Sequence, residues 1–171
     1  RGEIARRILR TAHRLGIDTV AVYSQADAGA PHVREATAAV PLGGNTGADS
    51  YLRIDKIVGA ARQAGADAVH PGYGFLSENT EFAQAVEDAG LTWVGPPAEA
   101  IRTLGNKSRA KQLAQARGVP CLPGYQGADQ TDERLLAAAR DIGFPLMVEA
   151  AAGGGGRGMG LGDGGGPAGG G

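Results

Sequence analysis

The chain has 171 residues, of which 17 are Lys or Arg and 18 are Asp or Glu, so its formal net charge is -1. This balance argues against the basic surface that neutralises a nucleic-acid backbone, and no apolar run reaches the length of a membrane span or of a signal-peptide core. The single cysteine, Cys121, cannot form an internal disulfide. We therefore expect a soluble protein of a reducing compartment, the cytoplasm or, in a eukaryote, the mitochondrial matrix, with no nucleic-acid and no membrane partner.

Helices and strands are expected to alternate along the first hundred residues. Apolar residues recur every three or four positions from Glu3 to Leu15, which predicts a helix that Gly16 ends. The β-branched segment Ile17–Ser24 follows and predicts a buried strand. The same order repeats with helices over residues 51–65 and 79–90 and strands over residues 66–72 and 91–96. This alternation predicts a parallel sheet with helices on both faces.

A second unit is expected to start near residue 105. Helices are predicted over residues 98–104 and 107–117, with Asn106 as the N-cap of the latter. The Pro- and Gly-rich stretch "VPCLPGYQGADQ" predicts a loop. A helix over residues 132–142 and a strand over residues 144–151 follow.

Glycine dominates the end of the chain, where it supplies 13 of the 19 residues from Gly153 to Gly171. Because glycine loses much backbone entropy on folding and has no side chain to bury, residues 160–171 are expected to form a flexible tail. The segment Gly153–Met159 differs because it follows a strand directly, so that its backbone N–H groups can form a cradle for nucleotide phosphates. A linker is an equal alternative, since the segment lacks the Lys-Ser/Thr of a Walker A loop and the spacing of a dinucleotide fingerprint.

The motif "HPGYGFLSEN" places Gly-Tyr-Gly directly after a predicted strand. Glycine there lets the backbone approach a ligand at the carboxyl edge of a parallel sheet. The alternative is a tight turn in which Tyr73 and Phe75 pack in the core and His70 bonds to backbone. Local chemistry favours the turn.

Lys107 has two interpretations. It is either a partner for nucleotide charge or one cation on a solvated helix face with Arg109 and Lys111. The histidines and acidic residues show no metal-ligand spacing, and no Ser, His and Asp set indicates a nucleophile.

Five segments in order resemble the front of a biotin carboxylase, the ATP-grasp enzyme of biotin-dependent carboxylases: "RGEIARRILRTAHRLGIDTVAVYS", "HPGYGFLSEN", "GPPAEAIRTLGNKSRAK", "GVPCLPGYQGADQ" and "AAAGGGGRGM". The resemblance covers Arg1 to Met159. "PGYQGADQ" is more similar to the acyl-CoA carboxylases of acetyl, propionyl, methylcrotonyl or geranyl type than to pyruvate carboxylase, which is the alternative. The resemblance implies an α/β fold: a Rossmann-like N-terminal domain over residues 1–104, the incomplete start of an ATP-grasp domain over residues 105–159, and the tail over residues 160–171.

The chemistry that the resemblance implies is ATP-driven phosphorylation of bicarbonate to carboxyphosphate, whose CO2 is captured by biotin on a carrier domain. Two Mg2+ ions, or Mn2+, offset the phosphate charge. The implied partners are a biotin carboxyl carrier domain, a carboxyltransferase subunit and, in the parent enzyme, further copies of the same chain.

The resemblance also assigns site residues. Lys107 matches a lysine that contacts ATP, and Met159 lies beside the nucleotide. Tyr73 and Gly74 match positions near the biotin end of the site. The loop that closes over the phosphates is matched by Gly153, Gly154, Gly155, Gly156 and Gly158.

The sequence departs from the family pattern in ways that affect function. Glu149 stands where the family has a lysine that reaches the ATP phosphates. Two unit charges about 4 Å apart interact by about 4 kcal/mol at an effective dielectric near 20, so the change from lysine to glutamate replaces an attraction of this size by a similar repulsion. The residues after Met159 are expected to lack the arginine and the apolar residues that form the loop's return strand in the family. The first sheet is expected to lack its opening strand, which is central, because residues upstream of Arg1 are expected to be missing.

In the family, the acidic Mg2+ ligands and the basic residues for bicarbonate and biotin lie beyond residue 171. We therefore expect no catalytic and no metal-ligating residue within this chain, and a fragment that is inactive alone. The alternatives are a nucleotide-binding or assembly module without catalysis and a remnant with a purely structural role.

Overall fold

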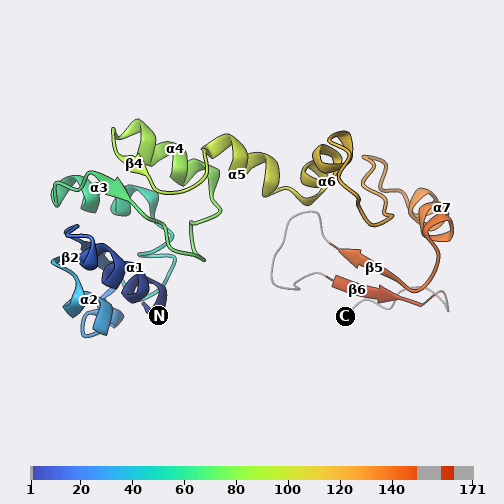
Figure 1. The fold of residues 1–171 in the computed structure, drawn as a ribbon. Helices are drawn as coiled ribbons and strands as arrows, with labels where there is room; N and C mark the ends of the chain where they lie inside the picture. Colours follow the sequence, from blue (N-terminus) through green and yellow to red (C-terminus); the bar gives the residue numbers. More distant parts are fainter. Residues whose placement is uncertain (1, 150–158, 164–171) are drawn as a thin grey trace. The chain divides into compact units, whose positions relative to one another are not determined.

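The computed structural model describes residues 2–149 and 159–163 and divides into two units, Arg1–Arg102 and Thr103–Gly171 (Figure 1). Each unit is described by itself.

Helices and short strands alternate in the first unit. Its elements in chain order are α1 (Glu3–Arg14), β1 (Val20–Tyr23), the short 3-10 helix η1 (Gln25–Asp27), α2 (Pro31–Glu35), β2 (Ala38–Pro41), α3 (Ile54–Gln63), β3 (Ala68–Val69), α4 (Thr80–Asp88), β4 (Thr92–Trp93) and α5 (Ala98–Leu104). The predicted helix–strand order is confirmed. Gly16 follows α1 with a φ of 72°, a left-handed conformation that favours glycine, as expected of a helix end.

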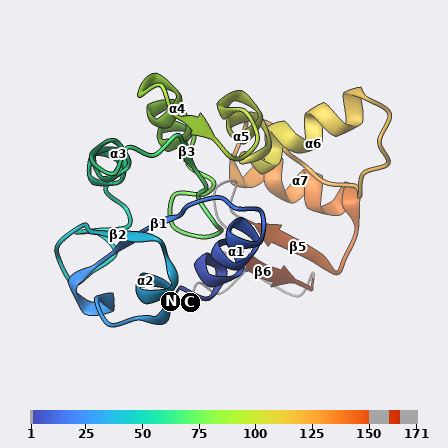
Figure 2. The same ribbon diagram turned by 60° about the vertical axis from the view of Figure 1, so that its left-hand side comes forward.

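The strands of the first unit pair in parallel, as predicted. Val20 of β1 lies opposite Ala38 of β2, and Ala68 of β3 lies opposite Thr92 of β4. Figure 2 shows the β1–β2 pair beside the short helix α2. No strand of the described residues joins the two pairs, so the expected single sheet consists of two separate pieces.

Three elements between residues 25 and 41, namely η1, α2 and β2, were not predicted from the sequence. β2 consists of small residues and a proline, which give little strand signal. Pro31 at the first position of α2 does favour a helix start, but the helix has only five residues. Arg6 of α1 fixes α2 through a bidentate ion pair with Glu35, at 2.6–2.9 Å.

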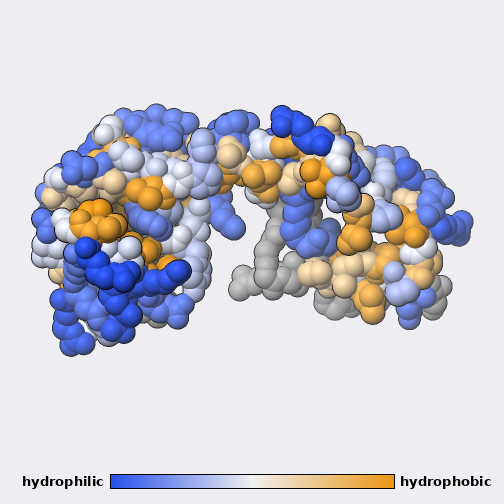
Figure 3. All heavy atoms as spheres, viewed as in Figure 1, coloured by the Kyte–Doolittle hydropathy of each residue, from blue (hydrophilic) through white to orange (hydrophobic). Residues whose placement is uncertain are grey.

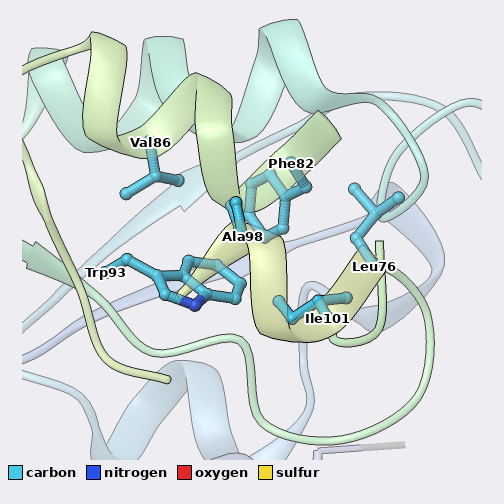
Figure 4. Packing of buried hydrophobic residues seen from close by; sticks show 7 residues of the cluster. Leu76, Phe82, Val86, Trp93, Ala98 and Ile101 are labelled. Atoms are coloured by element: carbon cyan, nitrogen blue, oxygen red, sulfur yellow. The ribbon is translucent and has the colours of Figure 1, made fainter. Parts of the chain in front are cut away.

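The hydrophobic core lies in the first unit, around α4, β4 and α5 (Figure 4). Phe82 and Trp93 meet edge to face with ring centroids 5.3 Å apart, and both are buried together with Val86. The Trp93 indole N–H donates to the Pro96 carbonyl at 3.0 Å, so the buried ring leaves no polar atom unpaired. Burying side chains of this size stabilises a fold by about 1.5–3 kcal/mol each. The core holds in place the segment that contains "HPGYGFLSEN", because Leu76 is one of its members.

The second unit contains two helices and one antiparallel hairpin among its described residues: α6 (Lys107–Ala116), α7 (Asp132–Ile142), β5 (Leu146–Glu149) and β6 (Met159–Gly162). The predicted helices, the loop between them and the strand are confirmed. Ala138 is the one buried hydrophobic residue of the described part of this unit, whereas Leu122, Val148 and Leu161 are 61–84% exposed. Figure 3 shows orange, hydrophobic surface at several places on this unit.

The expectation that nothing after Met159 can form a return strand is wrong. Residues 159–162 pair with β5 in antiparallel register, from Glu149 opposite Met159 to Leu146 opposite Gly162. Pairing in a ladder depends on backbone groups, which glycine provides as well as any residue, and Leu161 supplies an apolar side chain on the strand. The flexible tail predicted over residues 160–171 is therefore wrong for residues 160–162, which belong to β6, and residues 164–171 lie outside the described residues.

Candidate nucleotide site

Lys107 stands at the beginning of α6. Asn106 caps this helix as predicted, because its side-chain oxygen accepts the backbone N–H of Arg109 at 3.0 Å. The cap fixes where the helix begins and so fixes the position from which the Lys107 side chain extends.

Glu149 and Met159 mark the two ends of the glycine-rich segment. Glu149 is the last residue of β5, Met159 is the first of β6, and the two are paired in the ladder. Residues 150–158 connect them in sequence. The hairpin therefore brings together two residues, Glu149 and Met159, that flank the stretch 150–158, which contains the predicted cradle glycines.

The ammonium of Lys107 forms an ion pair and a hydrogen bond with the carboxylate of Glu149. Their side chains are 39% and 40% exposed, so the pair is accessible to solvent and to a ligand. An exposed pair of this kind stabilises a fold by only about 0.2–1 kcal/mol. The structure thus brings together a lysine expected to attract nucleotide phosphates and a carboxylate expected to repel them.

Lys107 therefore has an ion-pair partner on the surface of the second unit, and its role toward a nucleotide stays a prediction. Sequence reasoning named both Lys107 and Glu149 but missed their contact, because the residues are 42 positions apart and no local pattern connects them. The only feature of the sequence that could have indicated this contact is that two residues assigned to one site carry opposite charges.

The other predicted nucleotide residues divide into two groups. Met159 is described and is 44% exposed, at the end of the ladder beside Glu149. The cradle residues lie outside the described residues, and their role stays a prediction: Gly153, Gly154, Gly155, Gly156 and Gly158.

Tyr73 and Gly74 lie in the first unit, in the segment after β3. Tyr73 is 62% exposed, and its hydroxyl donates to the Glu3 carboxylate at 2.5 Å, a hydrogen bond that raises the pKa of Tyr73. Gly74 has a φ of 78°, which its lack of a Cβ permits. The role of this pair near biotin stays a prediction.

The turn interpretation of this segment is half right. His70 does bond to backbone, since its Nδ1 accepts the Gly72 N–H at 3.0 Å. Tyr73 and Phe75 are not core residues, because both are more than half exposed. Phe75 has a φ of 45° and lays its ring 5.0 Å from that of Tyr51, which holds it on the surface.

A polar network that sequence reasoning missed surrounds the carboxyl end of β1. The Tyr51 hydroxyl donates to Asp27 at 2.7 Å and accepts the backbone N–H of Ser24 at 2.9 Å, while the Ser24 hydroxyl donates to the same Asp27 oxygen. Burial, and then the bond to Asp27, raise the pKa of Tyr51. The network links the loop after β1 to the turn that precedes α3.

Within residues 2–149 and 159–163, no group of three or more His, Cys, Asp or Glu side chains is placed to hold a metal ion. In the same part of the chain, the helices are all too short or too polar to cross a membrane.

Comparison with known proteins identifies both units. The family model "Biotin carboxylase, N-terminal domain" matches residues 1–101, and the model "Carbamoyl-phosphate synthase L chain, ATP binding domain" matches residues 106–165. The alpha subunit of a mitochondrial methylcrotonoyl-CoA carboxylase from Oryza sativa subsp. japonica is 55% identical over 153 residues, which are 90% of this chain and 21% of that protein.

Solved structures agree with these matches. A biotin carboxylase–βγ-ATP complex from Campylobacter jejuni superposes with a TM-score of 0.91 at 44% identity, over 95% of this chain and 36% of that one. The biotin carboxylase domain of the Hydrogenobacter thermophilus 2-oxoglutarate carboxylase, in complex with MgADP, ADP and bicarbonate, gives a TM-score of 0.89 at 43% identity, over 94% of this chain and 35% of that one. The chain thus spans about a fifth of the first relative and about a third of these solved chains. Since the N-terminal-domain model matches more than half of its length, the chain belongs to the biotin carboxylase family.

Proposed function

We propose that this chain forms the front of the biotin carboxylase component of an acyl-CoA carboxylase, and that its second unit begins the nucleotide site. In the whole enzyme, the reaction is the ATP-dependent carboxylation of biotin on a carrier domain with bicarbonate as the carboxyl source. In the chain alone, we propose nucleotide binding without turnover.

The observation that carries the proposal is the contact of Lys107 with Glu149, the residue at which β5 ends before the glycine-rich segment. Lys107 contacts Glu149, and Glu149 pairs with Met159 in the β5–β6 ladder. A cation at the base of a glycine-rich hairpin is an arrangement suited to phosphate groups, because glycine N–H groups and an ammonium both stabilise anionic oxygens.

The described residues fit a nucleotide only in part. The ammonium of Lys107 suits a phosphate, whereas the carboxylate of Glu149 opposes one. ATP, when bound, supplies the phosphoryl group that activates bicarbonate, and the metal that accompanies it is proposed to be Mg2+ or Mn2+. The chain's own contribution is Lys107 of the second unit for the nucleotide and, as the family resemblance implies, Tyr73 and Gly74 of the first unit for biotin.

The identity of the relatives supports an acyl-CoA carboxylase over a pyruvate carboxylase. The methylcrotonoyl-CoA carboxylase subunit is 55% identical, against 40% for a pyruvate carboxylase from Rhizobium etli. The proposed partners are therefore a biotin carboxyl carrier domain, a carboxyltransferase subunit and a second copy of the component. The proposed compartment is the cytoplasm, or the mitochondrial matrix in a eukaryote.

Calorimetric titration with MgATP tests the nucleotide site. The two proteins to compare are the chain as written and Glu149→Lys, which turns a repulsive charge into an attractive one. We expect the variant to bind ATP at least tenfold tighter, since a single charge interaction of about 1.4 kcal/mol is sufficient. Asp141→Lys is the matched control, because it makes the same charge change on the exposed end of α7.

Two results contradict the proposal. One is the absence of ATP binding by the folded Glu149→Lys variant. The other is an equal gain in the Asp141→Lys control, which indicates unspecific attraction to a more basic protein in place of a built site.

A further inference from the structure

Glu149 lacks the positive charge that a phosphate site needs, and it also contacts the lysine that supplies such a charge. Its carboxylate holds the ammonium of Lys107 in an ion pair and a hydrogen bond. The residue paired with Glu149 across the ladder is Met159, which carries no charge. Among the described residues at the base of the hairpin, the positive charge of Lys107 and the negative charge of Glu149 therefore balance one another.

A ligand's phosphate that approaches Lys107 meets this internal pair. The phosphate must either displace the carboxylate from the ammonium or bind beside it and be repelled by it. Both cost binding free energy, and the cost grows with the negative charge of the ligand, because Coulomb energy is proportional to that charge. The uncharged part of a nucleotide, its base and ribose, does not experience this cost.

We infer that Glu149 is a specificity-determining residue: it occupies Lys107 and thereby removes the preference for ligands with more phosphate groups. The inference rests on the proposed nucleotide function. In the chain as written, adenosine, ADP and ATP are bound with similar affinity. Freeing Lys107 restores an affinity that rises with each phosphate.

The test measures dissociation constants for adenosine, ADP and ATP without Mg2+, which would neutralise the phosphates. Glu149→Gln keeps the size of the side chain and removes its charge. Asp141→Asn is the matched control, with the same charge change on an exposed carboxylate of α7 in the same unit. Circular dichroism checks that each variant keeps the helix content of the chain as written.

The expected result for Glu149→Gln is about a tenfold gain in ATP affinity, a smaller gain for ADP and less than about twofold for adenosine. Asp141→Asn is expected to change each of the three dissociation constants by less than about twofold. Lys107→Met combined with Glu149→Gln is expected to lose the gain, because the gain comes from a freed ammonium.

The outcomes separate this inference from the function on which it rests. If the chain as written already prefers ATP to adenosine as strongly as Glu149→Gln does, the inference is overturned and the nucleotide site stands. If the gain survives in the double variant, Lys107 is not the cation that Glu149 occupies, and the inference is also overturned. If no protein in the series binds any ligand, and Glu149→Lys does not bind ATP, the proposed function fails and the inference with it.

Discussion

Phe82→Ala should remove a large part of the stability of the first unit. Phe82 is only 2% exposed and packs edge to face on Trp93, with ring centroids 5.3 Å apart. Truncating a buried phenylalanine to alanine costs about 3–5 kcal/mol through lost burial and the cavity that remains. A domain of this size has a total stability of about 5–15 kcal/mol, so the loss is a large fraction of it.

Trp93 makes this measurement direct. It is the only tryptophan of the chain and lies in the same core, so its fluorescence during urea unfolding reports on the first unit. The control is Leu15→Ala, because Leu15 is 70% exposed and its truncation should change the free energy of unfolding by less than about 0.5 kcal/mol. An unchanged midpoint for Phe82→Ala, or equal losses for the two variants, would refute the assignment of this core.

Three further predictions concern the cap, the second unit and alkaline pH. Asn106→Ala should destabilise α6 by about 1 kcal/mol, because it removes the acceptor for the Arg109 N–H, and amide exchange in α6 should quicken while that in α4 is unchanged. In the unmodified chain, amides of α6 and α7 should exchange faster than those of α4, since the described part of the second unit buries one hydrophobic residue; equal protection would contradict this. Folding raises the pKa of Tyr51, so the folded state favours the neutral hydroxyl. The contribution of this hydroxyl to stability is therefore present below the unfolded pKa of about 10 and is lost as pH rises through the folded pKa. Tyr51→Phe should therefore reduce the loss of stability between pH 9 and pH 11, measured by urea unfolding at about those values; an identical loss in both proteins would show that Tyr51 does not titrate in this way.

Periodicity was sufficient to predict the longer helices and their order, but not the short elements η1, α2 and β2. Each of the helices α1, α3, α4 and α7 contains at least one buried residue. The two-residue strands β3 and β4 were predicted too long, over residues 66–72 and 91–96, because the residues on either side of each ladder belong to turns. The return strand β6 was missed because its strand character comes from backbone pairing with β5, which composition does not record.

The site could be predicted only as far as the family resemblance reaches. Lys107, Glu149 and Met159 were each identified by matching positions, and the structure then placed them at one hairpin base. The Lys107–Glu149 ion pair could not be predicted from either position, because it depends on how α6 lies against β5 within the second unit. The exposure of Tyr73 and Phe75 was missed for a similar reason: aromatic residues beside a buried strand favour a core interpretation, whereas Glu3 and Tyr51 hold these rings at the surface.

The central claim is that this chain is the front of a biotin carboxylase whose nucleotide site is weakened by Glu149. The most direct test is ATP hydrolysis that depends on bicarbonate and biotin, measured with the Campylobacter jejuni biotin carboxylase in which residues 1–159 of this chain replace the matched segment. We predict activity for the replacement that carries Glu149→Lys, and at least about a tenfold lower kcat/KM for ATP in the replacement with Glu149 retained. Folded replacements that are both inactive, or that are equally active, would contradict the claim.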